Sequence, residues 1–315
     1  MDLVKALAAI KPLLGETLAL YSGMVAYADG ILRAYDGVNS IKVEVPGHPS
    51  PWCVDGTKLT AIAKTGCELA LDATHLVIKM GRSRFKLYNH AQNELVPDLS
   101  HEGDAIPISD DDWKTLKLAT TFCSPHAVYP WAACIYVRDR KAYVTNNIVA
   151  AVFDIGLDVE GMIPAIAVQS LATAQDVHIS PHCVTLTRDG LSLRCSLPVA
   201  EPPPQFFRVC NEIVEAVTPI NEGLASAFES TTMIDSQNVI VRPNGIEASS
   251  GKGDLVEVDI ETGSTVEGIF DPRYIVPALK VSEFVDWNLY PQPVVFKGVK
   301  VKGMIIGKSR INNLE

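Results

Sequence analysis

One pattern recurs three times along this chain: a short apolar strand runs directly into a short helix. The copies occupy residues 54–64, 163–172 and 269–280, at intervals of about 105 to 110 residues. That interval is far longer than the repeat of a solenoid protein and is close to the size of one small domain. The 315-residue chain is therefore expected to contain three similar α+β domains in tandem.

Each predicted domain consists of two half-units, and each half-unit is a helix followed by several short strands. Leu3, Leu7 and Ile10 are spaced by four and three residues, which predicts the first opening helix. The equivalent helices are predicted within 110–122 and 205–217. The Pro202–Pro204 run is interpreted as a stiff connector, with a ligand for an aromatic groove as the alternative. These signals give the predicted domain bounds 1–104, 105–203 and 204–315.

Composition excludes several classes of protein. A net charge of −10 argues against a broad basic surface for nucleic acid, although the distribution of charge matters more than its sum. The seven cysteines include no Cys-x-x-Cys pair, which favours reduced thiols in a cytoplasm over zinc or redox sites. No apolar run reaches the roughly 18 residues of a membrane span. We therefore expect a cytoplasmic protein with no metal, no cofactor and no membrane contact.

Motifs for catalysis are also missing from the sequence. Asp110, Asp111 and Asp112 could hold Mg²⁺, but consecutive helical residues point in different directions, so helix capping is the better interpretation. His178 and His182 are four apart with Pro181 between them, which argues against a helical metal pair. No nucleophile elbow or complete phosphate loop is present. The chain is not expected to be an enzyme.

The order helix, strands, short helix, strands, repeated through three domains, resembles the DNA polymerase sliding clamps of the three-domain bacterial beta type. The better local matches are 3–14, 143–147 and 270–274. In that family two subunits close head to tail into a ring around duplex DNA, with helices lining the hole and sheets outside. The family pattern Thr-Asp-Gly-His-Arg-Leu is replaced here by residues 145–150, Thr-Asn-Asn-Ile-Val-Ala, a divergence that fits a phage or mobile-element clamp in a host cytoplasm.

The resemblance implies a processivity factor that encircles duplex DNA and tethers the replicative polymerase. The implied partners are double-stranded DNA, a second copy of the chain, and a polymerase and clamp loader that bind through short peptide motifs. The alternative is a non-ring polymerase accessory or DNA-binding module of the same fold. The overall acidity of the chain speaks against that alternative, because such a module would need a strongly basic face.

The ring interpretation requires basic helices. Six predicted helix windows hold nine basic and six acidic residues, whereas the whole chain holds 27 and 37. The loop at Tyr129 and Trp131 is expected by family position to touch DNA, with core packing as the alternative for Trp131. The basic residues predicted to face DNA are Lys5, Lys11, Lys58, Lys64, Lys114, Lys117, Arg208, Arg273 and Lys280.

The family position of the partner-peptide pocket also transfers to this chain. It lies between the second and third predicted domains and should combine exposed apolar side chains with a few polar groups. For Val149, Phe207 and Ile305 the alternative is burial in a core. The predicted walls are Thr145, Asn147, Val149, Phe207, Asp271, Tyr274, Met304, Ile305 and Ile306.

Overall fold

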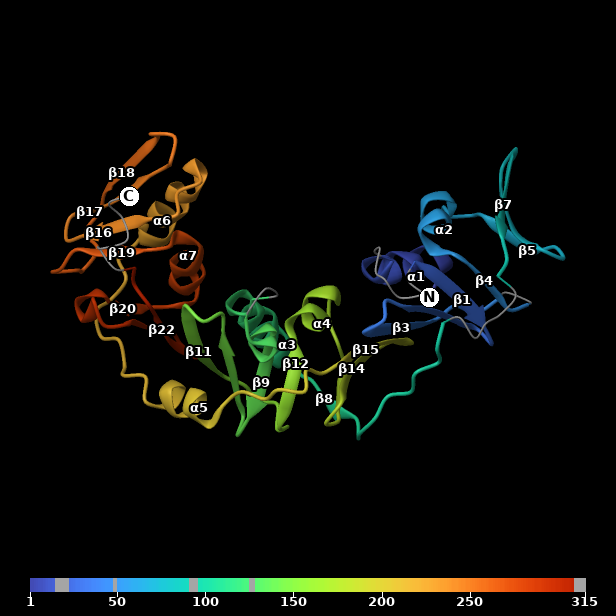
Figure 1. Ribbon diagram of the computed structural model, residues 1–315, viewed down its shortest axis with the longest axis horizontal. Helices are drawn as coiled ribbons and strands as arrows, with labels where there is room; N and C mark the ends of the chain where they lie inside the picture. Colours follow the sequence, from blue (N-terminus) through green and yellow to red (C-terminus); the bar gives the residue numbers. More distant parts are fainter. Residues whose placement is uncertain (15–22, 48–49, 91–95, 125–127, 309–315) are drawn as a thin grey trace. The chain divides into compact units, whose positions relative to one another are not determined.

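The computed structural model describes residues 1–14, 23–47, 50–90, 96–124 and 128–308 (Figure 1). The chain forms two compact units. The first is Met1–Trp113 with Gly161–Val199, and the second is Lys114–Glu160 with Ala200–Glu315. Each unit therefore joins parts of two predicted domains, and the domain bounds at 104 and 203 stay a prediction.

The first unit is built on an eight-stranded antiparallel sheet. Its strand order is β4-β1-β2-β3-β15-β14-β13-β8, so that β3 and β15, far apart in sequence, lie side by side. The strands are β1 (Met24–Ala28), β2 (Ile31–Tyr35), β3 (Asn39–Glu44), β4 (Trp52–Asp55), β8 (Ile106–Pro107), β13 (Asp176–Ile179), β14 (Cys183–Arg188) and β15 (Leu191–Ser196).

Helices α1 (Leu3–Ile10) and α2 (Gly56–Ile62) pack together in this unit, and α1 also contacts β2 and β3. Leu3, Leu7 and Ile10 are all buried, as the predicted spacing requires. The chain continues through β12 (Gly161–Pro164) into α4 (Ala165–Ser170), which contacts β15. A separate three-stranded sheet has the order β5-β6-β7, with β5 (Glu68–Leu71), β6 (His75–Met80) and β7 (Ser83–Tyr88).

The segment after β7 lies against the sheet of the first unit. Asp98 forms ion pairs with Arg33 of β2, at 2.9 Å, and with Lys42 of β3. Glu102 pairs with Arg194 of β15 at 3.2 Å and accepts a hydrogen bond from the Ser180 hydroxyl at 2.9 Å. Two acidic residues of the segment between β7 and β8 thus neutralise three basic residues of the sheet.

In the second unit, β9, β10, β11, β22, β21 and β20 lie side by side in one antiparallel sheet, in that order. A four-stranded sheet of the same unit has the order β18-β17-β16-β19. The strands are β9 (Cys134–Arg138), β10 (Lys141–Thr145), β11 (Val149–Asp154), β16 (Val239–Arg242), β17 (Gly245–Ser249), β18 (Leu255–Asp259), β19 (Gly268–Phe270), β20 (Phe284–Asp286), β21 (Val294–Lys297) and β22 (Val301–Ile305).

The two faces of the larger sheet are covered by different helices. The 3₁₀ turn Thr120–Phe122, which follows α3 (Asp110–Ala119), places Phe122 5.7 Å from Phe153 and 6.0 Å from Phe296 between ring centroids. Helix α7 (Pro272–Val281) contacts this turn and β22 on the same face. Helix α5 (Pro204–Asn211) covers the other face, where Phe207 meets Tyr143.

The third opening helix differs from its prediction. The sequence placed it within 205–217, but α5 ends at Asn211 and does not precede a strand of the four-stranded sheet. The helix that precedes β16 is α6 (Leu224–Thr231), which packs against α7. Phe206 and Cys210 both lie in α5. Ile213, three residues further along, has the spacing expected of a helix but follows the end of α5 and packs on Val295.

Candidate functional site

An apolar hollow of ≈ 290 Å³ lies in the second unit, where α5, β11 and β22 meet a 3₁₀ turn at Pro130–Ala133. None of the residues that the described structure places in its lining carries a charge. Such a hollow favours an apolar ligand group over an ionic one, because a charge there would lose its hydration without a partner. The lining residues are Tyr129, Trp131, Thr145, Asn147, Ile148, Val149, Ala150, Pro203, Gln205, Phe206, Val209, Met304 and Ile306.

One side of the hollow is a series of aromatic rings in contact. Tyr129 and Trp131 are stacked with centroids 5.8 Å apart, and Trp131 lies 5.2 Å from Phe206. Phe206 in turn lies 5.6 Å from Phe207, which contacts Tyr143 of the sheet edge-on at 5.2 Å. Packed aromatic pairs of this kind stabilise each other beyond their buried area. The series therefore holds the exposed ring of Tyr129 in place from the sheet outward.

The other side is held by the turn between β10 and β11. The Thr145 hydroxyl donates to the Val149 carbonyl at 2.7 Å and accepts from the backbone N–H of Asn147 at 3.0 Å. Asn146 accepts from the backbone N–H groups of Ile148 and Val149 at 3.1 and 2.8 Å. Asn147 has φ +73°, a left-handed conformation that asparagine tolerates better than most residues. The two polar side chains Thr145 and Asn146 are thus occupied by the turn itself.

Part of the predicted pocket coincides with this hollow. Thr145, Asn147, Val149, Met304 and Ile306 all line it. The remaining four predicted walls do not.

Ile305 is only 2% exposed because it faces the opposite side of β22 from Met304, and Phe207 anchors α5 on the sheet behind the lining. Asp271 and Tyr274 lie at the start of α7, where Asp271 is bound by Arg273 at 2.6 and 2.9 Å and by Lys308 at 3.5 Å. Hydrogen bonds and the charges of these two cations outweigh burial and lower the pKa of Asp271.

Sequence reasoning missed several lining residues on α5 and around it. Helix α5 begins with Pro204 at its first position, as expected for a proline-led helix. Val209 lies four residues after Gln205 and three after Phe206, which are helical spacings, and all three residues border the hollow. The helical spacing was readable in the sequence, but it does not say against which sheet face the helix packs.

The predicted DNA-facing residues of the first unit are exposed on or beside α1 and α2. Lys5 pairs with Asp2 at 3.5 Å, and Lys58 pairs with Asp55 at 3.1 Å. Each aspartate also caps the start of its own helix by accepting from the lysine backbone N–H. Lys11 and Lys64, which follow α1 and α2, are exposed as well.

In the second unit the predicted basic residues separate into two groups. Lys114 of α3 and Arg273 and Lys280 of α7 are exposed on the helices of one sheet face, and Lys280 pairs with Glu229 of α6 at 2.5 Å. Lys117 of α3 is partly buried, and burial lowers its pKa. Arg208 lies on α5 and therefore on the opposite sheet face from α7.

Tyr129 and Trp131 were predicted to touch DNA, and the structure places both in the apolar hollow. Among the described residues, no group of three or more His, Cys, Asp or Glu side chains is arranged to hold a metal ion. No described helix is long and apolar enough to cross a membrane.

Known structures resemble this chain over nearly its whole length. The sliding clamp of Bacillus subtilis DNA polymerase aligns with 98% of this chain and 97% of its own, at a TM-score of 0.80 and 16% identity. The beta subunit of the Streptococcus pyogenes DNA polymerase aligns over 97% of both chains, at a TM-score of 0.77 and 16% identity. The fold is that of the bacterial beta sliding clamps.

A third clamp, from Helicobacter pylori, was solved bound to a DNA ligase peptide. It aligns with 98% of this chain and 97% of its own, at a TM-score of 0.76 and 13% identity. No protein-family model matches the sequence, and no curated protein sequence matches it. The clamp fold is therefore carried here by a strongly divergent sequence.

Proposed function

We propose that this chain is a DNA sliding clamp, a ring of two head-to-tail copies that encircles duplex DNA and tethers a replicative polymerase. The observation that carries the proposal is the charge-free hollow walled by Tyr129, Trp131, Phe206 and Met304 on a clamp fold. A polymerase or a clamp loader would bind it through a short peptide with apolar and aromatic anchors. The protein acts through its shape, in a cytoplasm, without catalysing a reaction.

The exposed basic residues on the helices support a role in DNA contact. Lys5, Lys58 and Arg273 each lie beside an aspartate, so their attraction for phosphate is moderated. Weak, salt-sensitive phosphate contacts permit movement along the duplex, and a closed ring keeps the protein on it. Arg208, Tyr129 and Trp131 are left out of the proposed DNA contact because they lie away from the α7 face or in the hollow.

Peptide titration tests the hollow directly. The probe is a short, dye-labelled, uncharged peptide carrying Leu and Phe anchors, and binding is followed by fluorescence anisotropy. Met304→Ala and Trp131→Ala should each weaken binding about tenfold or more, equivalent to roughly 1–2 kcal/mol for loss of a central anchor. Tyr274→Ala is the matched control, because Tyr274 was predicted for the pocket but lies outside its lining. Equal affinities for all variants would place the partner site elsewhere.

The alternative of a non-ring accessory module is separated from the ring by solution mass. The ring requires a particle of about twice the 34.1 kDa chain mass at micromolar concentration. A particle that stays monomeric and binds DNA through one basic face would support the alternative.

A further inference from the structure

The apolar hollow of the second unit is built on a turn that has a counterpart in the first unit. In the β2–β3 turn the Asp36 carboxylate accepts from the backbone N–H groups of Val38 and Asn39 at 2.9 and 2.6 Å. In the β10–β11 turn beside the hollow, Asn146 accepts in the same way from the second and third residues after it. Strands β3 and β11 therefore start from the same kind of turn, and their positions can be compared one for one.

The counterpart of the hollow is polar where the hollow is apolar. Ala150 of β11 lies opposite Met304 of β22, which walls the hollow. Ser40 of β3, at the same distance from its turn, lies opposite Arg194 of β15. An arginine thus takes the place of the methionine wall, so the two surfaces suit ligands of different chemistry.

A short segment of the chain covers this polar surface. Residues 98–104, which we call the covering segment, run between the buried Val96 and strand β8. Asp98 and Glu102 in this segment are 58% and 45% exposed, whereas the three basic side chains that they bind are only 12% to 24% exposed. The covering segment therefore forms a layer outside the sheet, anchored at both ends, and it can lift without uncovering Val96.

Two further contacts fix the path of the covering segment. The ring of His101 lies against that of His178, with centroids 4.5 Å apart, and the Gly103 carbonyl oxygen lies 3.2 Å from His178 Nδ1. Gly103 has φ +87°, and a Cβ at this position would come within 2.5 Å of the Ile179 carbonyl oxygen. The surface thus accepts a chain in a defined register, with glycine directly after the second carboxylate.

The covering segment leaves three donors of this surface unpaired among the described residues. They are Nε of Arg33, Nε of Arg194 and the hydroxyl of Thr185, all of them buried. Thr185 is 0% exposed and lies opposite Arg194 on the neighbouring strand β14. Buried donors without a partner are costly, so a ligand that supplies more acceptors would be favoured here.

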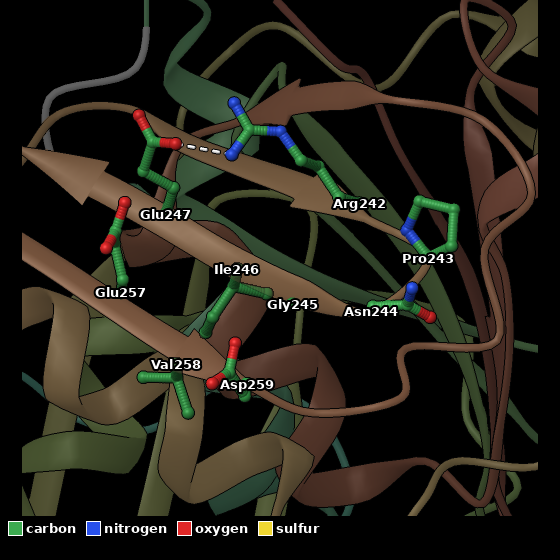
Figure 2. A pocket seen from close by; sticks show the side chains of 9 residues that line it. All are labelled: Arg242, Pro243, Asn244, Gly245, Ile246, Glu247, Glu257, Val258 and Asp259. Carbon is green, nitrogen blue, oxygen red and sulfur yellow. Dashed lines mark hydrogen bonds and ion pairs between the residues drawn. The ribbon is translucent and has the colours of Figure 1, made fainter.

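An arginine elsewhere in the chain shows fuller pairing. Arg242 donates through a terminal nitrogen to Glu247 (Figure 2) and through Nε to Glu267 at 3.1 Å. Arg33 and Arg194 instead meet their carboxylates through a terminal nitrogen, while Nε is left unpaired. A carboxylate placed side-on to an arginine accepts from both kinds of nitrogen, which is the stronger geometry. An incoming acidic group can therefore pair this surface more completely than the covering segment does.

We propose that the polar surface of the first unit is a second peptide-docking site, which takes an acidic segment of a partner protein in place of residues 98–104. The occupant carries two carboxylates four residues apart, as the covering segment does, and places them side-on to Arg33 and Arg194. The covering segment then acts as an inhibitor within the chain, because it holds the site until a better-paired segment displaces it. This site is separate from the apolar hollow and does not depend on ring formation.

Peptide titration tests the docking site. The probe is a dye-labelled peptide with the sequence of residues 98–104, Asp-Leu-Ser-His-Glu-Gly-Asp, followed by fluorescence anisotropy. A double variant, Asp98→Asn with Glu102→Gln, should bind it about tenfold or more tightly than the unaltered chain, because its own segment competes less. In the unaltered chain, hydrogen exchange of residues 98–104 should rise as the peptide saturates.

Matched variants fix the place and the register of binding. Arg194→Met, which copies the methionine of the hollow, should weaken binding about tenfold or more through loss of a charge-assisted hydrogen bond. Arg138→Met, on β9 of the second unit, is the control and should leave binding unchanged. A peptide with alanine in place of its glycine should also bind about tenfold more weakly, because its Cβ would meet the Ile179 carbonyl.

Three outcomes would overturn the proposal. Binding that survives Arg194→Met, or that a peptide with Asn and Gln in place of its acidic residues reproduces, would place the peptide elsewhere. No binding to the unaltered chain at about 5 mM peptide, above the effective concentration of an attached segment, would show that residues 98–104 are a permanent cover. Competition by duplex DNA would identify a nucleic-acid surface instead. None of these results bears on the sliding-clamp proposal, which the hollow and the solution mass test separately.

Discussion

Three helices begin with the same arrangement of one acidic and one basic residue. Asp2, Asp55 and Asp271 each cap a helix through the backbone N–H of a basic residue two or three positions later, and each carboxylate also pairs with that residue's side chain. The cap satisfies a helix N–H that has no partner within the helix. The pair keeps the basic side chain exposed and oriented at the helix start.

Asp271 should contribute most to stability, because its side chain is only 4% exposed and also faces Lys308 at 3.5 Å. Asp271→Asn should lower the free energy of unfolding by about 2 kcal/mol, through loss of a charged cap and of two part-buried charge-assisted hydrogen bonds from Arg273. Urea titration at pH 7 measures the loss. Glu222→Gln, an exposed change on a loop, is the control and should change little.

The same residue predicts a pH dependence. The pKa of Asp271 is lowered in the folded protein, so folding favours its ionised form. Its contribution is fully present above the unfolded-state pKa and is lost as pH falls through the folded-state pKa. The stability difference between the unaltered chain and Asp271→Asn should therefore shrink on acidification. A difference that stays constant down to pH 2 would contradict the assignment.

At the scale of elements, the sequence predicts most helices and misses one. Leu3, Leu7 and Ile10 show the helical spacing that burial confirms. Helix α6 has a similar pattern in Leu224, Ala227, Phe228 and Thr231, all buried. It was missed because it starts after Gly223 without a side-chain cap and contains two serines and a threonine, so its local start signal is weak.

The hollow could be predicted only in part, for a physical reason. The turn 145–149 belongs to one hairpin, and Thr145, Asn147 and Val149 were predicted from the family position of that segment. The opposite wall comes from α5, and the choice between Phe206 and Phe207 depends on which side of α5 meets the sheet. Adjacent helical residues point about 100° apart, so a one-residue error exchanges a wall for an anchor.

The two neighbouring phenylalanines should therefore respond differently to truncation. Phe207→Ala should lower the free energy of unfolding by about 2 kcal/mol, because its ring packs on Tyr136 and Tyr143. Phe206→Ala should cost less stability but should weaken peptide binding about tenfold. Urea unfolding and peptide anisotropy on both variants check this. Equal losses in both measurements for both variants would contradict the distinction.

At the scale of the whole molecule, an acidic chain carries several exposed basic residues on or beside its helices. Net charge is −10, yet Lys5, Lys11, Lys58 and Lys114 are all exposed on or beside α1, α2 and α3. The sequence count of nine basic to six acidic residues in the helix windows detected this trend, although Arg208 lies on the other sheet face from α7. The distribution of charge over the surface, rather than the net charge, decides how such a protein binds DNA.

Reversing Lys5, Lys11 and Lys58 to glutamate should weaken binding to duplex DNA. The slope of log affinity against log salt should become less negative by about 0.9 for each phosphate that the variant no longer neutralises. Anisotropy of a labelled duplex between about 50 and 200 mM salt provides the measurement. The matched control reverses Arg138, Lys141 and Lys252, which lie on strands and turns. An unchanged slope in the helix variant would show that DNA binds elsewhere.

The segment after β7, which carries Asp98 and Glu102, affects how DNA binding at the first unit's sheet depends on salt concentration. Asp98 and Glu102 are counterions that the chain itself supplies to Arg33, Lys42 and Arg194. DNA gains affinity by releasing mobile ions into solution, and a covalently attached carboxylate cannot be released in that way. A phosphate that approached these three cations would gain no mixing entropy from displacing the segment. Lowering the salt concentration strengthens most protein–DNA contacts, but it would not raise the affinity of this surface for DNA.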